Sequence, residues 1–249
     1  MNSPIGGSAR YAVVLALSML GACSDTQATS DRTDWAPNVQ MFERAIPGLA
    51  YVIVSESGPV ASGAFGVGQA PDTTAFTTAT PLRIASVTKS ITAIIALQLV
   101  DEGRLELDAS ARRYAPSLSL PDAVSVRHLL SHSSEGTVGT GYVYSSSRYA
   151  MLRQVIEAAS DTSFEAVVRA RILDRAKMQW YPSPDLGAHA ALVSTVDEMT
   201  KYLTALESGV LLPSKTLETL AVPSRSTTGT PLPVSLGWFA QPVQGRKVM

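Results

Sequence analysis

The sequence predicts an α+β fold in which a β-hairpin precedes one long buried helix and a mostly helical region. Two β-rich runs, residues 49–55 and 60–67, flank the turn Ser57-Gly58-Pro59, which is typical of a hairpin. Residues 87–102 are apolar on nearly every side, as in a helix that is buried all round. An isolated hairpin is not stable alone, so we expect a sheet with more strands.

The remaining elements are predicted from shorter patterns. Gly103 is expected to end the long helix, because glycine is favoured just after a helix C-terminus. We expect further helices over residues 38–45, 126–131, 147–159, 163–172 and 196–206, and a strand-like segment over residues 235–243.

The composition excludes several function classes. The chain has 249 residues, which suits one large domain or one domain with an insertion, and its net charge is −1. Because no basic stripe is present, we expect no nucleic-acid partner. A single cysteine, Cys23, allows no disulfide within the chain, and with only three histidines it argues against a zinc site. We expect no cofactor and no metal.

The first 23 residues have the layout of an export signal. Arg10 precedes an apolar run over residues 11–20, and the small residues Gly21 and Ala22 then lead to Cys23. The run is about half the roughly 20 residues needed to cross a bilayer. A plain secretory signal and a buried N-terminal helix are the alternative interpretations.

The end of this segment, Leu20-Gly21-Ala22-Cys23, resembles a bacterial lipobox. The resemblance implies lipidation of Cys23 and a periplasmic protein anchored to the outer membrane, because Ser24 fits outer-membrane sorting. We then expect a polar linker over residues 24–36 and a hydrolase domain over residues 37–249.

Ser86 and Lys89 are the candidate catalytic pair. Side chains three residues apart share one face of a helix, so Lys89 can reach the Ser86 hydroxyl. A serine needs a base to take its proton, and burial of an ammonium makes a lysine a better base at neutral pH. The helix start also offers N–H groups to a developing oxyanion. Alternatively, Ser86 caps the helix and Lys89 is a solvated residue of its first turn.

Several segments together resemble the serine β-lactamase and penicillin-binding-protein-like superfamily. They include the run from Leu82 to Asp108 with its S-x-x-K motif, and the segments Val126–Gly136, Tyr144–Tyr149 and Leu192–Met199. The resemblance is strongest to the branch of class C β-lactamases, D-alanyl-D-alanine carboxypeptidases and family VIII esterases. It implies a β-lactamase/transpeptidase-like fold, an antiparallel sheet with a mostly helical subdomain.

The resemblance also implies roles for individual residues. Ser86 would be acylated, and its own N–H would form half of the oxyanion hole. Lys89 and Tyr144 would together move the proton. Ser146 would contact substrate where the family's Y-x-N motif has asparagine. A hydroxyl can still donate one hydrogen bond, but it does not donate and accept through separate groups as an amide does, which favours an ester-like or unusual substrate.

The three histidines have no catalytic assignment at this stage. His128 and His132 are four residues apart, but a metal site would need further ligands and no glutamate follows His128. Structural roles are therefore favoured for both, and His189 is unassigned.

The family's third motif, K-T-G or H-x-G, is absent from the 249 residues. We therefore expect that the sequence is a fragment of a longer enzyme and that C-terminal strands of the sheet are missing. The predicted function is a serine hydrolase that acts through an acyl-enzyme on an ester, a β-lactam or a D-Ala peptide bond. The alternative is an inactive, lipid-anchored envelope protein that binds peptidoglycan-like ligands.

Overall fold

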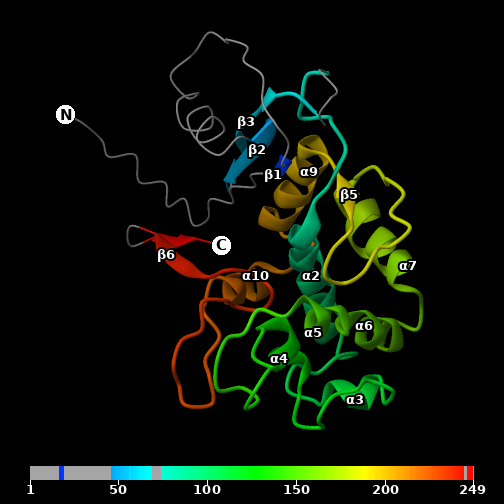
Figure 1. The fold of residues 1–249 in the computed structure, drawn as a ribbon, viewed down its shortest axis with the longest axis vertical. Coiled ribbons are helices and arrows are strands. Elements are labelled where there is room, and N and C mark those ends of the chain that lie inside the picture. The colour runs from blue at the N-terminus through cyan, green and yellow to red at the C-terminus, as the bar shows by residue number, and fades with distance from the viewer. Residues whose placement is uncertain (1–16, 20–45, 56, 69–73, 244–245, 249) are drawn as a thin grey trace, which may run out of the picture.

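The computed structural model describes residues 17–19, 46–55, 57–68, 74–243 and 246–248, and shows the expected α+β fold (Figure 1). The predicted hairpin is confirmed: β2 (Gly48–Ser55) pairs antiparallel with β3 (Gly58–Gly66). The short strand β1 (Leu17–Met19) pairs with the other edge of β2. Cys23 and the expected helix over residues 38–45 lie outside the described residues.

The predicted buried helix is confirmed as α2 (Thr88–Asp101), in which every side chain from Thr88 to Leu99 is buried. A 3-10 turn, η1 (Ala85–Val87), leads into it. Ser86 lies in the middle of this turn, and no side chain caps either η1 or α2. The expectation that Ser86 could cap the helix is therefore wrong, and its hydroxyl is available for other contacts.

The helical region follows the predicted order with three differences in detail. The expected helix over residues 147–159 is broken at Met151, and the one over residues 163–172 continues through a π-helical segment. The helices are α3 (Ala111–Tyr114), α4 (Val126–Leu130), α5 (Ser146–Ala150), α6 (Leu152–Ser160), α7 (Phe164–Val168), η2 (Arg169–Leu173), α8 (Asp174–Ala176), α9 (Val196–Glu207) and α10 (Ser214–Leu220). Three short helices, α3, α8 and α10, were not predicted.

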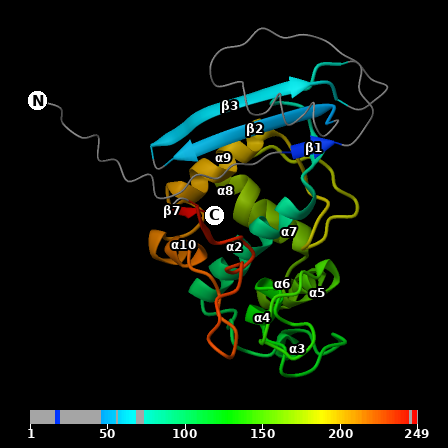
Figure 2. The ribbon, with the colours of Figure 1, turned by 60° about the vertical axis from the view of Figure 1, so that its left-hand side comes forward.

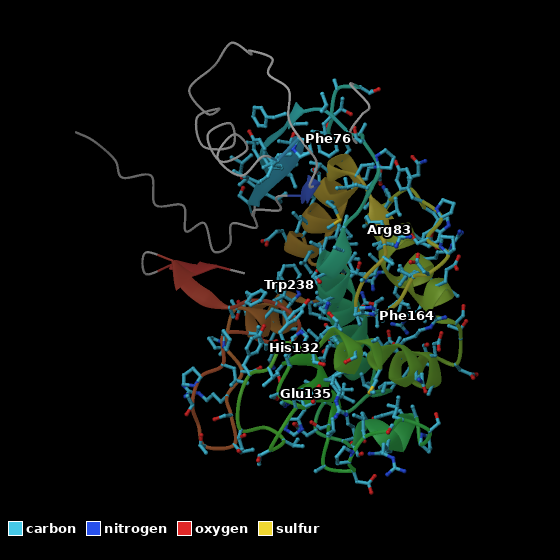
Figure 3. All side chains as sticks on the ribbon, viewed as in Figure 1. Phe76, Arg83, His132, Glu135, Phe164 and Trp238 are labelled. Carbon is cyan, nitrogen blue, oxygen red and sulfur yellow. The ribbon has the colours of Figure 1, made fainter. Side chains whose placement is uncertain are left out.

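The hairpin and the helices α3–α6 lie at opposite ends of the molecule, with α2 between them (Figures 1 and 2). Helix α9 packs under β2 and β3. One continuous hydrophobic core joins these parts, and it includes Phe76 near the hairpin and Phe164 on α7 (Figure 3). This core holds α2 from all sides.

Two short antiparallel pairs complete the described sheets. Strand β4 (Leu82–Arg83) pairs with β5 (Val193–Ser194), and β6 (Gln241–Val243) pairs with β7 (Arg246–Val248). Only the last three residues of the expected strand over 235–243 are a strand. The β4–β5 pair matters for the site, because it holds the chain just before Ser86 against the loop over residues 187–192.

Neither a membrane-spanning helix nor a metal-binding cluster is found in the part of the chain that the structure describes.

Candidate active site

Ser86 is presented to solvent at the start of the buried helix α2. Ala85 takes a left-handed backbone conformation with φ of 46°, which turns the chain sharply before the serine. The N–H of Ile84 donates to the carbonyl of Leu192 at 2.9 Å and continues the β4–β5 pairing. Backbone strain of this kind clusters at functional sites. The turn leaves Ser86 exposed at the end of a rigid helix.

The Lys89 ammonium is buried and hydrogen-bonded in three directions. Only 4% of Lys89 is exposed. Its Nζ donates to the Oγ of Ser86 at 3.2 Å, to the Oγ of Ser146 at 3.3 Å and to the carbonyl of His189 at 2.8 Å. A lysine ammonium has three protons to donate, so these contacts match its capacity. The expected contact between Lys89 and Ser86 is therefore confirmed.

Tyr144 approaches Ser86 from the opposite side. Its hydroxyl donates to the Ser86 Oγ at 2.8 Å, and the Lys89 Nζ lies 5.0 Å from the centre of its ring. Burial raises the pKa of the Tyr144 phenol, but hydrogen bonds with Lys89, Ser86 and Ser146 and the charge of Lys89 outweigh it, so the pKa is lowered. A tyrosine with a lowered pKa is more easily converted to a base. Ser86, Lys89, Tyr144 and Ser146 thus form one cluster.

The same face of α2 holds the loop over residues 187–192. The Thr92 hydroxyl donates to the carbonyl of Ala188 at 2.6 Å, and the Thr88 hydroxyl accepts from the N–H of Leu192 at 3.3 Å. Neither threonine was predicted to belong to the site. Their signal was present, because polar residues at 88, 89 and 92 share one side of a helix that is otherwise apolar.

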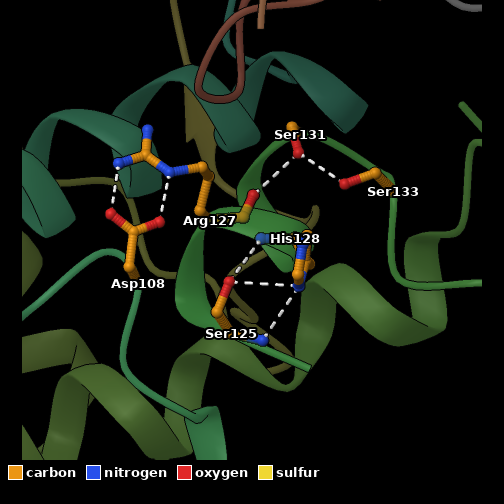
Figure 4. A network of polar contacts seen from close by, with 6 residues as sticks. All are labelled: Asp108, Ser125, Arg127, His128, Ser131 and Ser133. Carbon is orange, nitrogen blue, oxygen red and sulfur yellow. Dashed lines mark hydrogen bonds and ion pairs between the residues drawn. The ribbon is translucent and has the colours of Figure 1, made fainter. Parts of the chain in front are cut away.

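His128 stabilises the start of α4 and does not reach the cluster. The Ser125 side chain accepts from the N–H of His128, and the ring Nδ1 of His128 accepts from the N–H of Ser125, which makes a capping box (Figure 4). Next to it, Arg127 forms an ion pair with Asp108 at 2.6 Å (Figure 4). The structural role expected for His128 is confirmed.

His132 lies beside the cluster, near Glu135 (Figure 3). Its ring is 4.5 Å from the Tyr144 ring and 5.1 Å from the Tyr149 ring, measured between centroids. Burial first, and then the charge of Lys89, lower the pKa of His132 to about 4. His189, unassigned from sequence, supplies the carbonyl that accepts from Lys89. No local pattern could have indicated this contact, because 100 residues separate the partners.

The beta-lactamase family model matches residues 31–248, which is most of the chain. The chain belongs to the beta-lactamase family. The expected superfamily is thereby confirmed.

Solved structures confirm the fold of this beta-lactamase-family chain. The octameric penicillin-binding protein homologue from Pyrococcus abyssi is 21% identical with a TM-score of 0.71, over 85% of this chain and 65% of that chain. The penicillin binding protein from Bacillus halodurans is 19% identical with a TM-score of 0.68, over 85% and 84%. The D-amino acid amidase from Ochrobactrum anthropi SV3 is 20% identical with a TM-score of 0.64, over 73% and 70%.

A curated relative gives a shorter match. The ML-236A carboxylate methylbutanoyltransferase of Penicillium citrinum is 36% identical over a stretch that covers 22% of this chain and 18% of that protein. The chain therefore spans about two thirds of the Pyrococcus abyssi structure and less than a fifth of this relative.

Proposed function

We propose that this beta-lactamase-family chain is a serine acyl hydrolase whose nucleophile is Ser86. One observation carries the proposal: the exposed Ser86 Oγ has the Tyr144 hydroxyl at 2.8 Å and the Lys89 Nζ at 3.2 Å. Both distances lie within reach for proton transfer. A serine acting only as a structural residue has no need of two titratable partners at its hydroxyl.

The contacts support a definite sequence of proton transfers. In the resting state both Tyr144 and Lys89 donate to Ser86, so the pair must first lose one proton to solvent. Ser86 Oγ then attacks the acyl carbon while its proton passes to this pair, and the Ser86 N–H donates to the oxyanion. The pair returns the proton to the leaving group and an ester at Ser86 remains. Water, deprotonated by the same pair, then hydrolyses that ester.

The proposed substrate is a carboxylic ester in preference to a β-lactam or a D-Ala peptide bond. Ser146 supports this choice because its hydroxyl is short and already accepts from the Lys89 Nζ at 3.3 Å. A longer amide at this position could offer a substrate amide two N–H donors and a separate carbonyl acceptor, whereas this hydroxyl has one proton to donate and already accepts from Lys89. An ester needs fewer hydrogen-bonding partners than an amide, because it has no N–H group to donate.

Covalent labelling tests the nucleophile. A fluorophosphonate probe should label the wild-type protein, a fluorescent penicillin should label it less or not at all, and Ser86→Ala should abolish any label. Ser90→Ala is the matched control, because Ser90 lies on the same helix but its hydroxyl donates to the Val87 carbonyl, away from Lys89. Labelling by the fluorophosphonate alone supports an esterase. Equal labelling of Ser86→Ala contradicts the proposal.

The alternative is an inactive envelope protein that binds peptidoglycan-like ligands without turnover. Ser146 also fits this alternative, because a weaker substrate contact favours binding over catalysis. A folded wild-type protein that takes up neither probe, yet binds peptidoglycan fragments in a pull-down, would favour it over the hydrolase.

We also propose that the signal is removed before Cys23 and that the Cys23 thiol carries lipid, which would place the protein in the periplasm at the outer membrane. This rests on the sequence, since Cys23 lies outside the described residues. Strand β1 falls within the leader, so a mature chain starting at Cys23 would have β2 as a sheet edge. Mass spectrometry of the mature protein tests this, and an unlipidated start at residue 24 or later would contradict it.

A further inference from the structure

His132 is placed to control the position of Tyr144. It follows α4 and takes a left-handed backbone conformation with φ of 53°, and only 4% of it is exposed. Its ring lies against the rings of Tyr144 and Tyr149, and the edge of the Tyr142 ring faces it at 5.9 Å. Three tyrosines therefore surround one histidine at the edge of the catalytic cluster.

His132 makes a hydrogen bond to each of the two residues that flank Tyr144. The N–H of Val143 donates to the His132 carbonyl at 2.8 Å. The N–H of Ser145 donates to the His132 ring Nδ1 at 3.2 Å. One residue thus holds the backbone on both sides of Tyr144. Without these bonds the turn would be loosely held, since Val143 is 51% exposed and Tyr144 45% exposed.

The contact at Ser145 fixes the protonation state of the ring. An N–H donor must meet a lone pair, so Nδ1 carries no proton and the neutral ring has its proton on Nε2. A second proton would place an Nδ1–H against the Ser145 N–H and break the bond. It would also put a positive charge beside the buried ammonium of Lys89, which faces this ring from α2.

We propose that neutral His132 is a positioning residue, which clamps the Val143–Ser145 backbone so that the Tyr144 hydroxyl meets Ser86. The inference rests on the proposed function, because it assigns His132 a role in the same reaction. His132 touches neither substrate nor the reacting atoms, so its effect passes through Tyr144. A displacement of about 1 Å at a reacting group can cost on the order of 10²-fold in rate.

The titration of His132 can be distinguished from that of the charged and titratable groups around its ring. Among the described residues, Lys89 is the charge that acts on the ring, and Tyr142, Tyr144 and Tyr149 are the titratable groups packed on it. The nearby Glu135 is held in an ion pair with Arg148 at 3.2 Å. Burial raises the pKa of Tyr142 and of Tyr149, and Tyr144→Phe removes the third phenol, so proton uptake at mildly acidic pH can be assigned to the histidine.

Two variants distinguish the hydrogen bond that the His132 ring accepts from Ser145 from the packing of that ring against Tyr144. His132→Phe keeps an aromatic ring against Tyr144 but has no acceptor for Ser145. His132→Asn keeps an acceptor, since its Oδ1 is bonded to Cγ as Nδ1 is, and asparagine tolerates a positive φ. His128→Asn is the control, because it changes the neighbouring histidine, which caps α4 and does not touch Tyr144.

The primary readout is the titration of the Tyr144 phenol, followed by NMR of ring-labelled tyrosine and assigned with Tyr144→Phe. In the wild type, His132→Asn and His128→Asn, the pKa of Tyr144 should lie below its usual value. In His132→Phe it should return toward about 10. The rate of p-nitrophenyl ester hydrolysis should fall at least about tenfold in kcat for His132→Phe with KM little changed, and should largely recover in His132→Asn.

The outcomes separate this inference from the proposed function. An unchanged Tyr144 titration in a folded His132→Phe overturns the clamp even if the wild type hydrolyses esters. The predicted titrations in a wild type that hydrolyses nothing support the clamp and reject the hydrolase. If His132→Phe does not fold, the ring tautomer of the wild type decides by nitrogen NMR. A proton on Nδ1 near neutral pH overturns the proposal, and an unprotonated Nδ1 supports it.

Discussion

The two sides of the candidate site are built in different ways. On one side, Lys89 belongs to a helix buried from Thr88 to Leu99, and Thr92 and Lys89 bind the loop over residues 187–192. On the other side, Tyr144 is 45% exposed, and its turn depends on two hydrogen bonds that the N–H groups of Val143 and Ser145 donate to His132. Lys89 is thus fixed by the core, whereas Tyr144 is fixed by a few polar contacts.

The largest effect is expected from removing the charge on the buried side. Lys89→Met keeps the length of the side chain but removes the proton carrier, so ester hydrolysis should fall by about 10⁴-fold. Lys215→Met is the control, because Lys215 is exposed on α10 and should leave the rate unchanged. Initial rates measure the effect, and a loss below tenfold would show that Lys89 is only structural.

A smaller loss of activity is expected on the exposed side. Tyr144→Phe removes the hydroxyl that lies 2.8 Å from Ser86, so kcat should fall by about 10²- to 10³-fold. Because Tyr144 is half exposed, the free energy of unfolding should change by less than about 0.5 kcal/mol. Parallel measurement of rates and denaturation checks both. A fall in the free energy of unfolding with no fall in rate would mean that Tyr144 stabilises the fold and takes no part in the reaction.

The buried side should respond to packing, which Gly237 tests. Gly237 has φ of 81°, and a Cβ there would lie 2.5 Å from the Tyr149 hydroxyl and 2.6 Å from the Ala93 Cβ. Gly237→Ala should therefore lower the free energy of unfolding by about 2–3 kcal/mol. Gly229→Ala is the matched control: its φ is 84° but its Cβ would meet open space, so only the backbone strain remains. If denaturant unfolding shows the same loss of free energy for both variants, the loss in Gly237→Ala is not due to packing.

Stability should also depend on pH on the exposed side of the site, through His132. The pKa of His132 is lowered to about 4, chiefly by burial, from about 6.5 in an unfolded chain. Between these values the unfolded state binds more protons, so the free energy of unfolding falls as pH falls from about 6.5 toward 4. The loss due to His132 is at most about 3 kcal/mol.

The contribution of His132 can be isolated by comparing slopes. His128 and His189 also have lowered pKa values, chiefly through burial, and add to the same pH window. Unfolding should therefore depend less steeply on pH in His132→Asn than in the wild type. Identical slopes would show that the ring does not stay neutral in the folded protein.

The sequence predicted the buried side better than the exposed side, for a physical reason. The apolar pattern of residues 87–102 specified a buried helix, and helical spacing alone brought Lys89 to Ser86. Tyr144 could be named only through a family resemblance, because 58 residues separate it from Ser86. The contacts of His132 and His189 depend on how loops meet in space, and no local periodicity encodes them.

The central claim is that Ser86 carries the acyl group, and peptide mapping tests it most directly. The wild-type protein and Tyr144→Phe are mixed with p-nitrophenyl acetate, quenched in acid at early times, digested and analysed by mass spectrometry. The account predicts one acetyl group on the peptide that contains Ser86, formed more slowly in Tyr144→Phe. A folded wild type that is acetylated at another residue, or at none while it releases nitrophenol, would contradict it.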